Sequence, residues 1–220
     1  MSHQDKYENF GGLIKSESEG SDFDRVILQR NSAITVIAPH GGGIEPGTSE
    51  IAKAIAGGEF SLYCFEGLKA EGNYEALHIT GTNFDDPECL QLTTNSRIVL
   101  AIHGCNEGNK VVYVGGRNEN LKAQIIEVLK GVAFQAEEDV SSHSGRDTRN
   151  ICNRGVQNGG VQLEISEGLR REMFSGLKRP ERQFTKASFS TFVDAIRTAL
   201  LALDVLDENI RPAIEDGGRV

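Results

Sequence analysis

The sequence contains no tryptophan, and only 6% of its residues are aromatic. Its four cysteines, Cys64, Cys89, Cys105 and Cys152, are widely scattered and include no C-x-x-C pair. This spacing is typical neither of a disulfide framework nor of a structural zinc knuckle. We therefore expect the thiols to be buried, because free cysteine is among the residues most often found in protein interiors.

Long hydrophobic runs are also missing. No stretch approaches the roughly 20 apolar residues of a membrane-spanning helix. The N-terminal MSHQDKYENF is polar, whereas a signal peptide begins with basic residues and continues with an apolar stretch. We expect a protein that is synthesised in the cytoplasm without a signal peptide and that has no membrane partner.

The chain lacks the positive charge of a nucleic-acid-binding protein. Its net charge is −9, whereas nucleic-acid binding requires a basic surface. The charge is unevenly distributed, since residues 141–190 carry +4 and the remainder carries −13. A basic region on an acidic protein is either a solvated helical face or a surface that steers an anionic ligand, and both readings stay open.

Length and composition favour one soluble globular domain. The chain has 220 residues, 38% of them hydrophobic, and no stretch resembles a linker. We predict a single catalytic domain over residues 1–220, with residues 1–24 poorly ordered near their start.

Strand and helix patterns alternate along the chain. Short apolar runs rich in β-branched residues predict buried strands, and apolar residues at helical spacing predict helices between them. The predicted strands cover residues 25–29, 33–38, 60–65, 76–80, 97–102, 110–114, 133–136 and 161–165. The predicted helices begin at Thr48 or Ser49, run from 85 to 95, 118 to 131 and 166 to 174, and end with 188–206. This order predicts an α/β protein with a mixed sheet between helices.

Two histidines follow buried strands directly. His40 and His103 each come after an apolar run and are each followed by glycine. In an open α/β sheet, ligands bind at the carboxyl ends of the strands, so the two imidazoles are expected to converge. Glu45 is separated from His40 by a loop with three glycines, which can fold its carboxylate back beside the imidazole. Two histidines and a glutamate form a catalytic zinc set with one position left for water, although cobalt and nickel also suit these ligands.

Glu164 is the candidate general base. It lies within the otherwise apolar VQLEIS, where an unpaired charge is costly unless a metal or water lies nearby. A zinc hydrolase needs such a carboxylate to take a proton from water and pass it to the leaving nitrogen. The alternative is that Glu164 faces solvent on an edge strand or pairs with Arg154 or Arg170.

The same glycine loop also permits a rival interpretation. His-Gly-Gly-Gly is the oxyanion-hole motif of some serine esterases, but the chain contains no G-x-S-x-G nucleophile motif. It also contains no H-E-x-x-H, no P-loop and no G-x-G-x-x-G. A nucleophilic Cys105 has no supporting partner in the sequence. Both rivals therefore rank below a metal site.

Six blocks of sequence together resemble the phage-type poly-γ-glutamate hydrolases: APHGGGIEPGTSEIA, LHITGTNFDDP, IVLAIHGC, VYVGGRN, NICNRG and GVQLEIS. The resemblance extends from about residue 33 to 174. It implies a zinc carboxypeptidase-like fold, a three-layer α/β/α sandwich with a mixed central sheet and one zinc ion per chain. It also implies that His40, Glu45 and His103 are the ligands and that Glu164 is the general base. The His40 to Glu45 spacing departs from the H-x-x-E of carboxypeptidases, so the similarity to those enzymes is structural.

The resemblance also suggests residues that hold the substrate. Asn153 and Arg154 are similar to the Asn-Arg pair that binds the substrate carboxylate in carboxypeptidases, but here the pair follows the second histidine instead of preceding it. Arginine binds carboxylate through two parallel hydrogen bonds, which makes Arg154 the first candidate and Arg146 and Arg117 the next. His78 is a further candidate for reaching the site from a strand end.

The predicted function is zinc-dependent hydrolysis of the γ-glutamyl amide bonds of poly-γ-glutamate. The resemblance implies a phage-encoded, monomeric capsule depolymerase that is released when the host lyses. Two alternatives remain. One is a zinc-dependent deacylase or carboxypeptidase acting on a small acyl-amino acid, and the other is a non-catalytic module that binds an anionic polymer.

Overall fold

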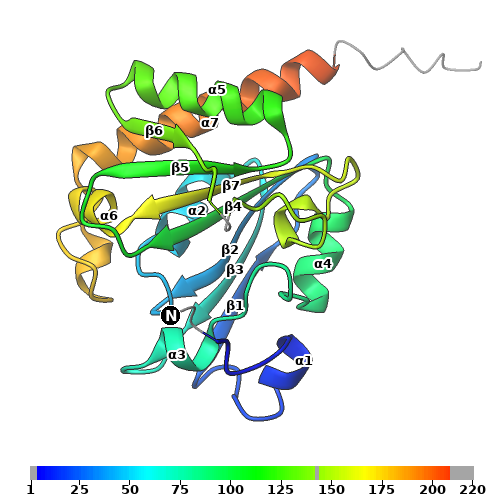
Figure 1. Ribbon diagram of the computed structural model, residues 1–220, viewed down its shortest axis with the longest axis vertical. Helices are drawn as coiled ribbons and strands as arrows, with labels where there is room; N and C mark the ends of the chain where they lie inside the picture. The colour runs from blue at the N-terminus through cyan, green and yellow to red at the C-terminus, as the bar shows by residue number, and fades with distance from the viewer. Residues whose placement is uncertain (1–3, 142–143, 209–220) are drawn as a thin grey trace, which may run out of the picture.

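The computed structural model describes residues 4–141 and 144–208, and within these ranges seven strands form one mixed sheet (Figure 1). The strand order is β1-β3-β2-β4-β7-β5-β6. The strands are β1 (Phe23–Leu28), β2 (Ile34–Gly42), β3 (Ser61–Gly67), β4 (Ile98–Cys105), β5 (Val111–Gly116), β6 (Gln135–Glu138) and β7 (Val161–Ser166).

The four central strands run in one direction. β3, β2, β4 and β7 pair in parallel, whereas β1 is antiparallel to β3 and β5 is antiparallel to β7. β6 pairs in parallel with β5. The carboxyl ends of β2, β4 and β7 therefore meet at one edge of the sheet, which is where an open α/β sheet binds its ligand.

Helices cover both faces of the sheet. One face packs against α2 (Thr48–Ala56), α5 (Glu119–Gly131), α6 (Glu167–Met173) and α7 (Ala187–Glu208). The other packs against α1 (Phe10–Leu13), α3 (Asn73–Leu77), α4 (Pro87–Thr94) and the 3-10 turn η1 (Ile151–Asn153), and a second 3-10 turn, η2 (Glu181–Gln183), precedes α7. Successive residues of β2 alternate between the two cores, with Val36 in the first and Ile37 in the second. The predicted three-layer α/β/α sandwich with a mixed central sheet is confirmed (Figure 1).

The helix starts follow the predicted chemistry in most cases. Asn118 accepts a hydrogen bond from the backbone N–H of Leu121 at 3.1 Å and begins α5, and Asp86 begins α4 in the same way, with Pro87 in the first turn. α2 differs, because its N-cap is Gly47, with a φ of 103°. Within the described residues, no helix combines the length and the apolar character needed to cross a bilayer.

One predicted strand is wrong. Residues 76–80 were expected to pair in the sheet, but they form the end of α3 and an extended segment on the sheet face. β3 already has β1 on one side and β2 on the other, so it offers no free edge to this segment. Residues 78–80 instead lie beside the end of β2, within reach of His40.

The N-terminal segment is better ordered than the sequence suggested. Phe10 and Leu13 are buried in the core of the second face, and the rings of Phe10 and Phe65 meet edge to face with centroids 6.1 Å apart. The backbone N–H of Phe10 donates to Asp85 at 2.8 Å. Residues of the 4–24 segment therefore pack against the core, while residues 1–3 lie outside the described residues.

Candidate active site

An irregularity in β2 sets the direction of the His40 side chain. The pairing of β2 with β3 shifts register between Ala38 and Gly41, which spans Pro39 and His40. Proline has no N–H for the ladder, and a bulge of this kind re-aims the neighbouring side chain. The strand continues through Gly42, so His40 lies inside the bulged end of the strand and not in the loop that the sequence suggested.

The three glycines allow the loop to fold tightly between β2 and α2. Only Gly42 has a left-handed φ, +64°, while a Cβ on Gly41 would lie 2.1 Å from the Ser49 hydroxyl. The backbone N–H of Glu45 donates to the carbonyl of His40 at 2.9 Å, and the hydroxyl of Thr48 donates to the Glu45 carbonyl at 2.9 Å. Close packing, more than unusual backbone angles, therefore brings the Glu45 carboxylate back to His40.

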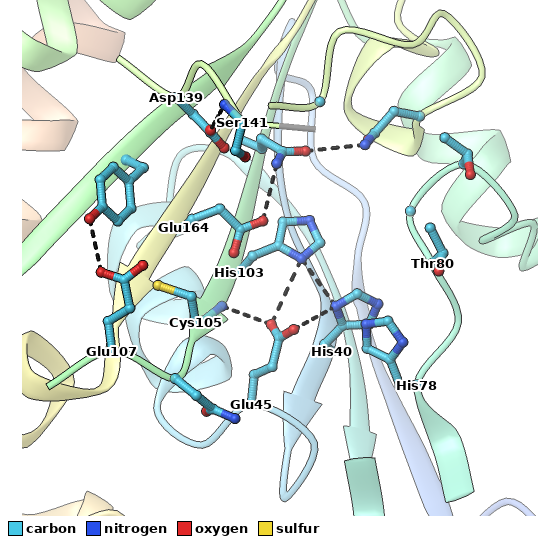
Figure 2. A pocket seen from close by; sticks show the side chains of 18 of the residues that line it. His40, Glu45, His78, Thr80, His103, Cys105, Glu107, Asp139, Ser141 and Glu164 are labelled. Carbon is cyan, nitrogen blue, oxygen red and sulfur yellow. Dashed lines mark hydrogen bonds and ion pairs between the residues drawn. The ribbon is translucent and has the colours of Figure 1, made fainter. Parts of the chain in front are cut away.

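His40, Glu45 and His103 converge as predicted (Figure 2). His40 Nδ1 lies 3.0 Å from Glu45 Oε1 and 3.1 Å from His103 Nδ1, and His103 Nδ1 lies 3.8 Å from Glu45 Oε2. The other Glu45 contact is a hydrogen bond from the backbone N–H of Gly104 to Oε2 at 2.8 Å. Two imidazole nitrogens and one carboxylate, from three different segments, thus lie within 3.0–3.8 Å of one another.

The donor set fits a tetrahedral zinc ion. Zinc–ligand bonds of about 2.0–2.1 Å at tetrahedral angles separate the ligand atoms by roughly 3.3 Å. The two Nδ1 atoms are 3.1 Å apart, and the Glu45 oxygens lie 3.0 Å (Oε1) from His40 Nδ1 and 3.8 Å (Oε2) from His103 Nδ1. His40 Nε2 contacts the carbonyl of Ile79 at 2.8 Å, which assigns the proton to Nε2 and leaves the Nδ1 lone pair for a metal. His103 Nε2 is buried without a hydrogen-bond partner among the described residues. The residues present therefore suit the metal that the sequence predicts.

The surroundings of the two histidines shift their pKa values in opposite directions. Burial alone would lower the pKa of His40, but the charge and hydrogen bond of Glu45 outweigh it, and the pKa is raised. Burial, reinforced by the charge of His40, lowers the pKa of His103 to about 3.

His78 lies against His40 but does not face the same point. Its ring is tilted 36° over the His40 ring with centroids 4.1 Å apart, whereas the His103 ring meets His40 at 61°. A ligand atom of His78 lies within 4.8 Å of those of His40 and Glu45. Because a metal binds in the plane of an imidazole, the stacked His78 is less suited to join His40 as a ligand than the edge-on His103.

Glu164 lies beside the convergent donors. It is in the middle of the sheet, opposite His103 of β4 and Tyr113 of β5, so the alternative that placed it on an edge strand is wrong. Its Oε1 accepts a hydrogen bond from Gln162 Nε2 at 3.1 Å. Burial and the charge of Glu45 raise the pKa of Glu164 to about 8. A carboxylate tuned towards neutral pH suits a general base.

Cys105 follows His103 by two residues and lines the same cavity. Burial and the charge of Glu164 raise the pKa of its thiol to about 11. Nucleophilic cysteines have lowered pKa values and lie in electropositive surroundings. The environment of Cys105 therefore favours an inert thiol.

The convergent donors open into a cavity of about 960 Å³. Among the described residues that line it, Arg146 is the one arginine or lysine, and it pairs with Glu138 at 2.6 Å. The lining carboxylates are Glu45, Glu75, Glu107, Glu137, Glu138, Asp139, Asp147 and Glu164. The expectation that residues 141–190 supply a cationic groove is therefore not met at this cavity.

Three predicted substrate-binding residues lie outside the cavity lining. The Arg154 guanidinium is exposed and donates to the carbonyl of Arg149 at 3.0 Å, and Asn153 is buried, where its amide donates to the carbonyls of Gly145 and Asp147. Arg117 follows β5, and because β5 is antiparallel to β7, it lies at the opposite edge of the sheet from Glu164. Of the predicted substrate-binding residues, the structure brings His78 and Arg146 to the cavity.

Two residues beside the site were not predicted from the sequence. Gln162 lies two positions before Glu164 on the same strand face, so the alternation of VQLEIS was the available signal. Asp5 contacts His78, with Oδ1 2.7 Å from Nδ1. Nothing in the local sequence marks Asp5, since it is 73 residues away from its partner.

Comparison with known proteins agrees with this geometry. A family model described as poly-gamma-glutamate hydrolase matches residues 7–195. The YndL protein of Bacillus subtilis (strain 168) is 37% identical over 185 residues, which cover 83% of this chain and 72% of YndL.

Two solved structures have nearly the same fold. The structure of a bacteriophage poly-gamma-glutamate hydrolase has a TM-score of 0.89 and 32% identity, and the match covers 92% of this chain and all of that chain. A zinc-free, apo structure of YndL has a TM-score of 0.86 and 35% identity, over 90% of this chain and 98% of that one. On the family model and these two structures, the chain belongs to the poly-gamma-glutamate hydrolase family.

Proposed function

We propose that this protein is a zinc-dependent hydrolase that cleaves the γ-glutamyl amide bonds of poly-γ-glutamate. The observation that carries the proposal is the convergence of His40 Nδ1, His103 Nδ1 and the Glu45 carboxylate, with contacts of 3.0–3.8 Å, beside Glu164. Membership of the family supports the substrate class, and the zinc-free form described for YndL supports the choice of metal. His40, Glu45 and His103 are proposed as the ligands of one zinc ion per chain.

Zinc bound at this point would act as a Lewis acid on the scissile carbonyl and would lower the pKa of a water molecule. Glu164 is proposed to take a proton from the attacking water, whose oxygen bonds to the γ-carbonyl carbon. The C–N bond then breaks, and Glu164 passes the proton to the departing amine nitrogen. Gln162, which donates to Glu164 Oε1 at 3.1 Å, holds the carboxylate in place during both transfers.

Arg146 is proposed to bind an α-carboxylate of the polymer. It lines the cavity, and its side chain is 53% exposed, so it can leave Glu138 and form two parallel hydrogen bonds with a substrate carboxylate. His78 lines the same cavity beside His40 and is proposed as a second substrate contact. Arg154 and Arg117 would bind substrate only if the polymer extends beyond the cavity, and Asn153 is buried and acts within the fold.

The biological setting follows from the family resemblance. Poly-γ-glutamate forms bacterial capsules, and we propose that the enzyme is phage-encoded, acts as a monomer and degrades the capsule after host lysis releases it. These points depend on the source of the chain and not on the geometry of the site.

The decisive experiment compares Glu164→Gln with Glu107→Gln. Both carboxylates line the cavity, but Glu107 accepts a hydrogen bond from the Tyr113 hydroxyl at 2.8 Å and is not among the residues that converge with His40. Loss of a general base should lower kcat by about 10²- to 10⁴-fold, with zinc content unchanged, whereas Glu107→Gln should retain most of the activity. Activity would be measured as chain shortening of purified poly-γ-glutamate, with chelation and zinc restoration as a parallel test.

The same assay separates the alternatives. A deacylase or carboxypeptidase would release single residues or cleave a small acyl-amino acid instead of shortening long chains internally. A non-catalytic binding module would bind the polymer and lose nothing on Glu164→Gln. Full activity in chelator, from protein that contains no stoichiometric metal, would refute the zinc-dependent mechanism.

A further inference from the structure

Asp5 joins the N-terminal segment to the segment beside the candidate metal site. Its Oδ1 lies 2.7 Å from His78 Nδ1, and its Oδ2 accepts a hydrogen bond from the backbone N–H of Thr80 at 2.6 Å. The side chains of Asp5 and His78 are only 12% and 13% exposed. One carboxylate therefore fixes both ends of the three-residue segment 78–80.

The residue between these two contacts is the one that orients His40. The carbonyl of Ile79 accepts the hydrogen bond from His40 Nε2 at 2.8 Å, and Ile79 is completely buried. The ring of His78 lies over that of His40, with centroids 4.1 Å apart. Movement of segment 78–80 would therefore change both the partner of Nε2 and the surface against which the imidazole packs.

Segment 78–80 has no sheet ladder of its own to hold it. It follows α3, which is five residues long, and it is not part of any strand. A short connection of this kind is held in place by side-chain contacts, and here Asp5 makes two of them, at 2.7 and 2.6 Å.

Asp5 itself is anchored firmly. Five residues later, Phe10 is buried and its backbone N–H donates to Asp85 at 2.8 Å. Lys6 and the Tyr7 hydroxyl both donate to Glu17, at 2.8 and 2.7 Å. Residues 6–10, which follow Asp5, are thus held by contacts with other parts of the protein. Asp5 can therefore restrain segment 78–80.

We infer that Asp5 is a positioning residue for the metal ligand His40, acting through segment 78–80. The inference rests on the proposed metal site, because its consequence is the affinity of that site for zinc. Partners behind a metal-binding histidine fix its tautomer and orientation, and their loss typically weakens metal binding roughly 10- to 100-fold. Here the partner of His40 Nε2 is the Ile79 carbonyl. Asp5 acts indirectly, by fixing the segment that carries this carbonyl.

The test measures zinc affinity in Asp5→Ala, Asp5→Asn and the control Glu8→Gln by competition with a chromogenic chelator. Asp5→Ala removes both contacts and should weaken zinc binding by roughly 10-fold or more. Asp5→Asn should be weakened less, since its amide oxygen can still accept from Thr80. Glu8 is exposed on the same segment, so Glu8→Gln removes an equal charge and should bind zinc within about twofold of the wild type.

Two further measurements distinguish positioning from general stability. The visible spectrum of the cobalt-substituted protein reports ligand geometry and should change in Asp5→Ala, while the melting temperature of metal-free Asp5→Asn should stay near that of the wild type. Zinc affinity within twofold of the wild type in both Asp5 variants would overturn the proposal. So would weaker affinity with an unchanged cobalt spectrum, because Asp5 would then act on stability alone.

A wild-type protein that binds no zinc would refute the proposed function but would not decide the role of Asp5. The restraint of segment 78–80 by Asp5 is then tested on the metal-free protein by hydrogen exchange of the Thr80 amide. Faster exchange in Asp5→Ala than in Glu8→Gln supports the restraint of segment 78–80, and equal exchange overturns it.

Discussion

Replacing Arg170 with methionine should be among the most damaging changes to this protein. Arg170 is 1% exposed, and its guanidinium donates to three backbone carbonyls, those of Ile165 at 3.0 Å, Pro46 at 2.7 Å and Cys105 at 3.0 Å. Pro46 directly follows the proposed ligand Glu45, and Cys105 lies two residues after His103. One side chain therefore joins β7 to the two segments that carry the proposed metal ligands.

The expected loss follows from these three bonds. A carbonyl that loses its partner in the interior costs about 1–3 kcal/mol, and breaking a buried charged network costs about 3–5 kcal/mol in total. Water reaching the more open carbonyls reduces the sum, so we expect Arg170→Met to lower the free energy of unfolding by about 3–5 kcal/mol. For a chain of this size that corresponds to a melting temperature lower by roughly 6–20 °C.

The assay is urea unfolding of the metal-free protein followed by far-UV circular dichroism, because the chain has no tryptophan to report by fluorescence. The neighbouring Arg171 provides the control, since it is 61% exposed and pairs with Glu167 one helical turn away. Arg171→Met should cost at most about 0.5 kcal/mol. Arg170→Lys, whose single ammonium cannot reach all three carbonyls, should fall between the two. Equal small losses in Arg170→Met and Arg171→Met would refute the reasoning.

Two further predictions concern Glu164 and the glycine loop. In the metal-free folded protein, the pKa of Glu164 is raised from 4.5 to about 8. As the pH rises, the unfolded state therefore loses this proton at a lower pH than the folded state does. The free energy of unfolding of the wild type, relative to that of Glu164→Gln, should therefore decrease as the pH rises from about 4.5 to about 8. If urea unfolding shows the same difference between the two proteins throughout this range, the pKa shift is contradicted. Gly42→Ala should cost at least about 1–2 kcal/mol, because Gly42 has a φ of +64° and a Cβ there would lie 2.6 Å from the Gly67 carbonyl oxygen. Gly58→Ala, whose Cβ meets nothing within 4 Å, is the matched control, and the two variants should differ in melting temperature.

The convergence of His40, Glu45 and His103 could be predicted because it depends on local signals. His40 and His103 each end an apolar run, and the ends of neighbouring parallel strands necessarily meet at one edge of a sheet. Five of the eight predicted strands lie within two residues of observed ones at both ends, since their apolar runs are short and bounded by polar residues. The predictions for β2 and β4 begin within one residue of the observed strands but end four and three residues too early. The position of Glu164 beside His103 follows from the same pattern.

The direction of β5 could not be predicted in this way. A strand reads alike in its local sequence whether it pairs in parallel or antiparallel, because both alternate with a period of two. Because β5 is antiparallel to β7, Arg117 lies at the opposite edge of the sheet from Glu164. In the sequence, however, Arg117 comes at the end of its strand just as His103 comes at the end of β4. The role of segment 78–80 was missed for a related reason, since its β-branched residues predict a strand and only the occupied edges of β3 prevent one.

The charge of the cavity depends on topology and not on any one stretch of sequence. The basic residues of 141–190 are largely used within the fold: Arg170 binds carbonyls, Arg182 pairs with Glu50 and Arg149 pairs with Asp147. Carboxylates from separate segments, which a count along the chain keeps apart, gather instead around the convergent histidines. A polyanionic substrate is repelled by such a lining, so its binding requires a local positive charge. A divalent cation held by two neutral imidazoles and one carboxylate retains a net positive charge at the point where the scissile carbonyl must lie. The metal would then be needed to bind the polymer as well as to cleave it.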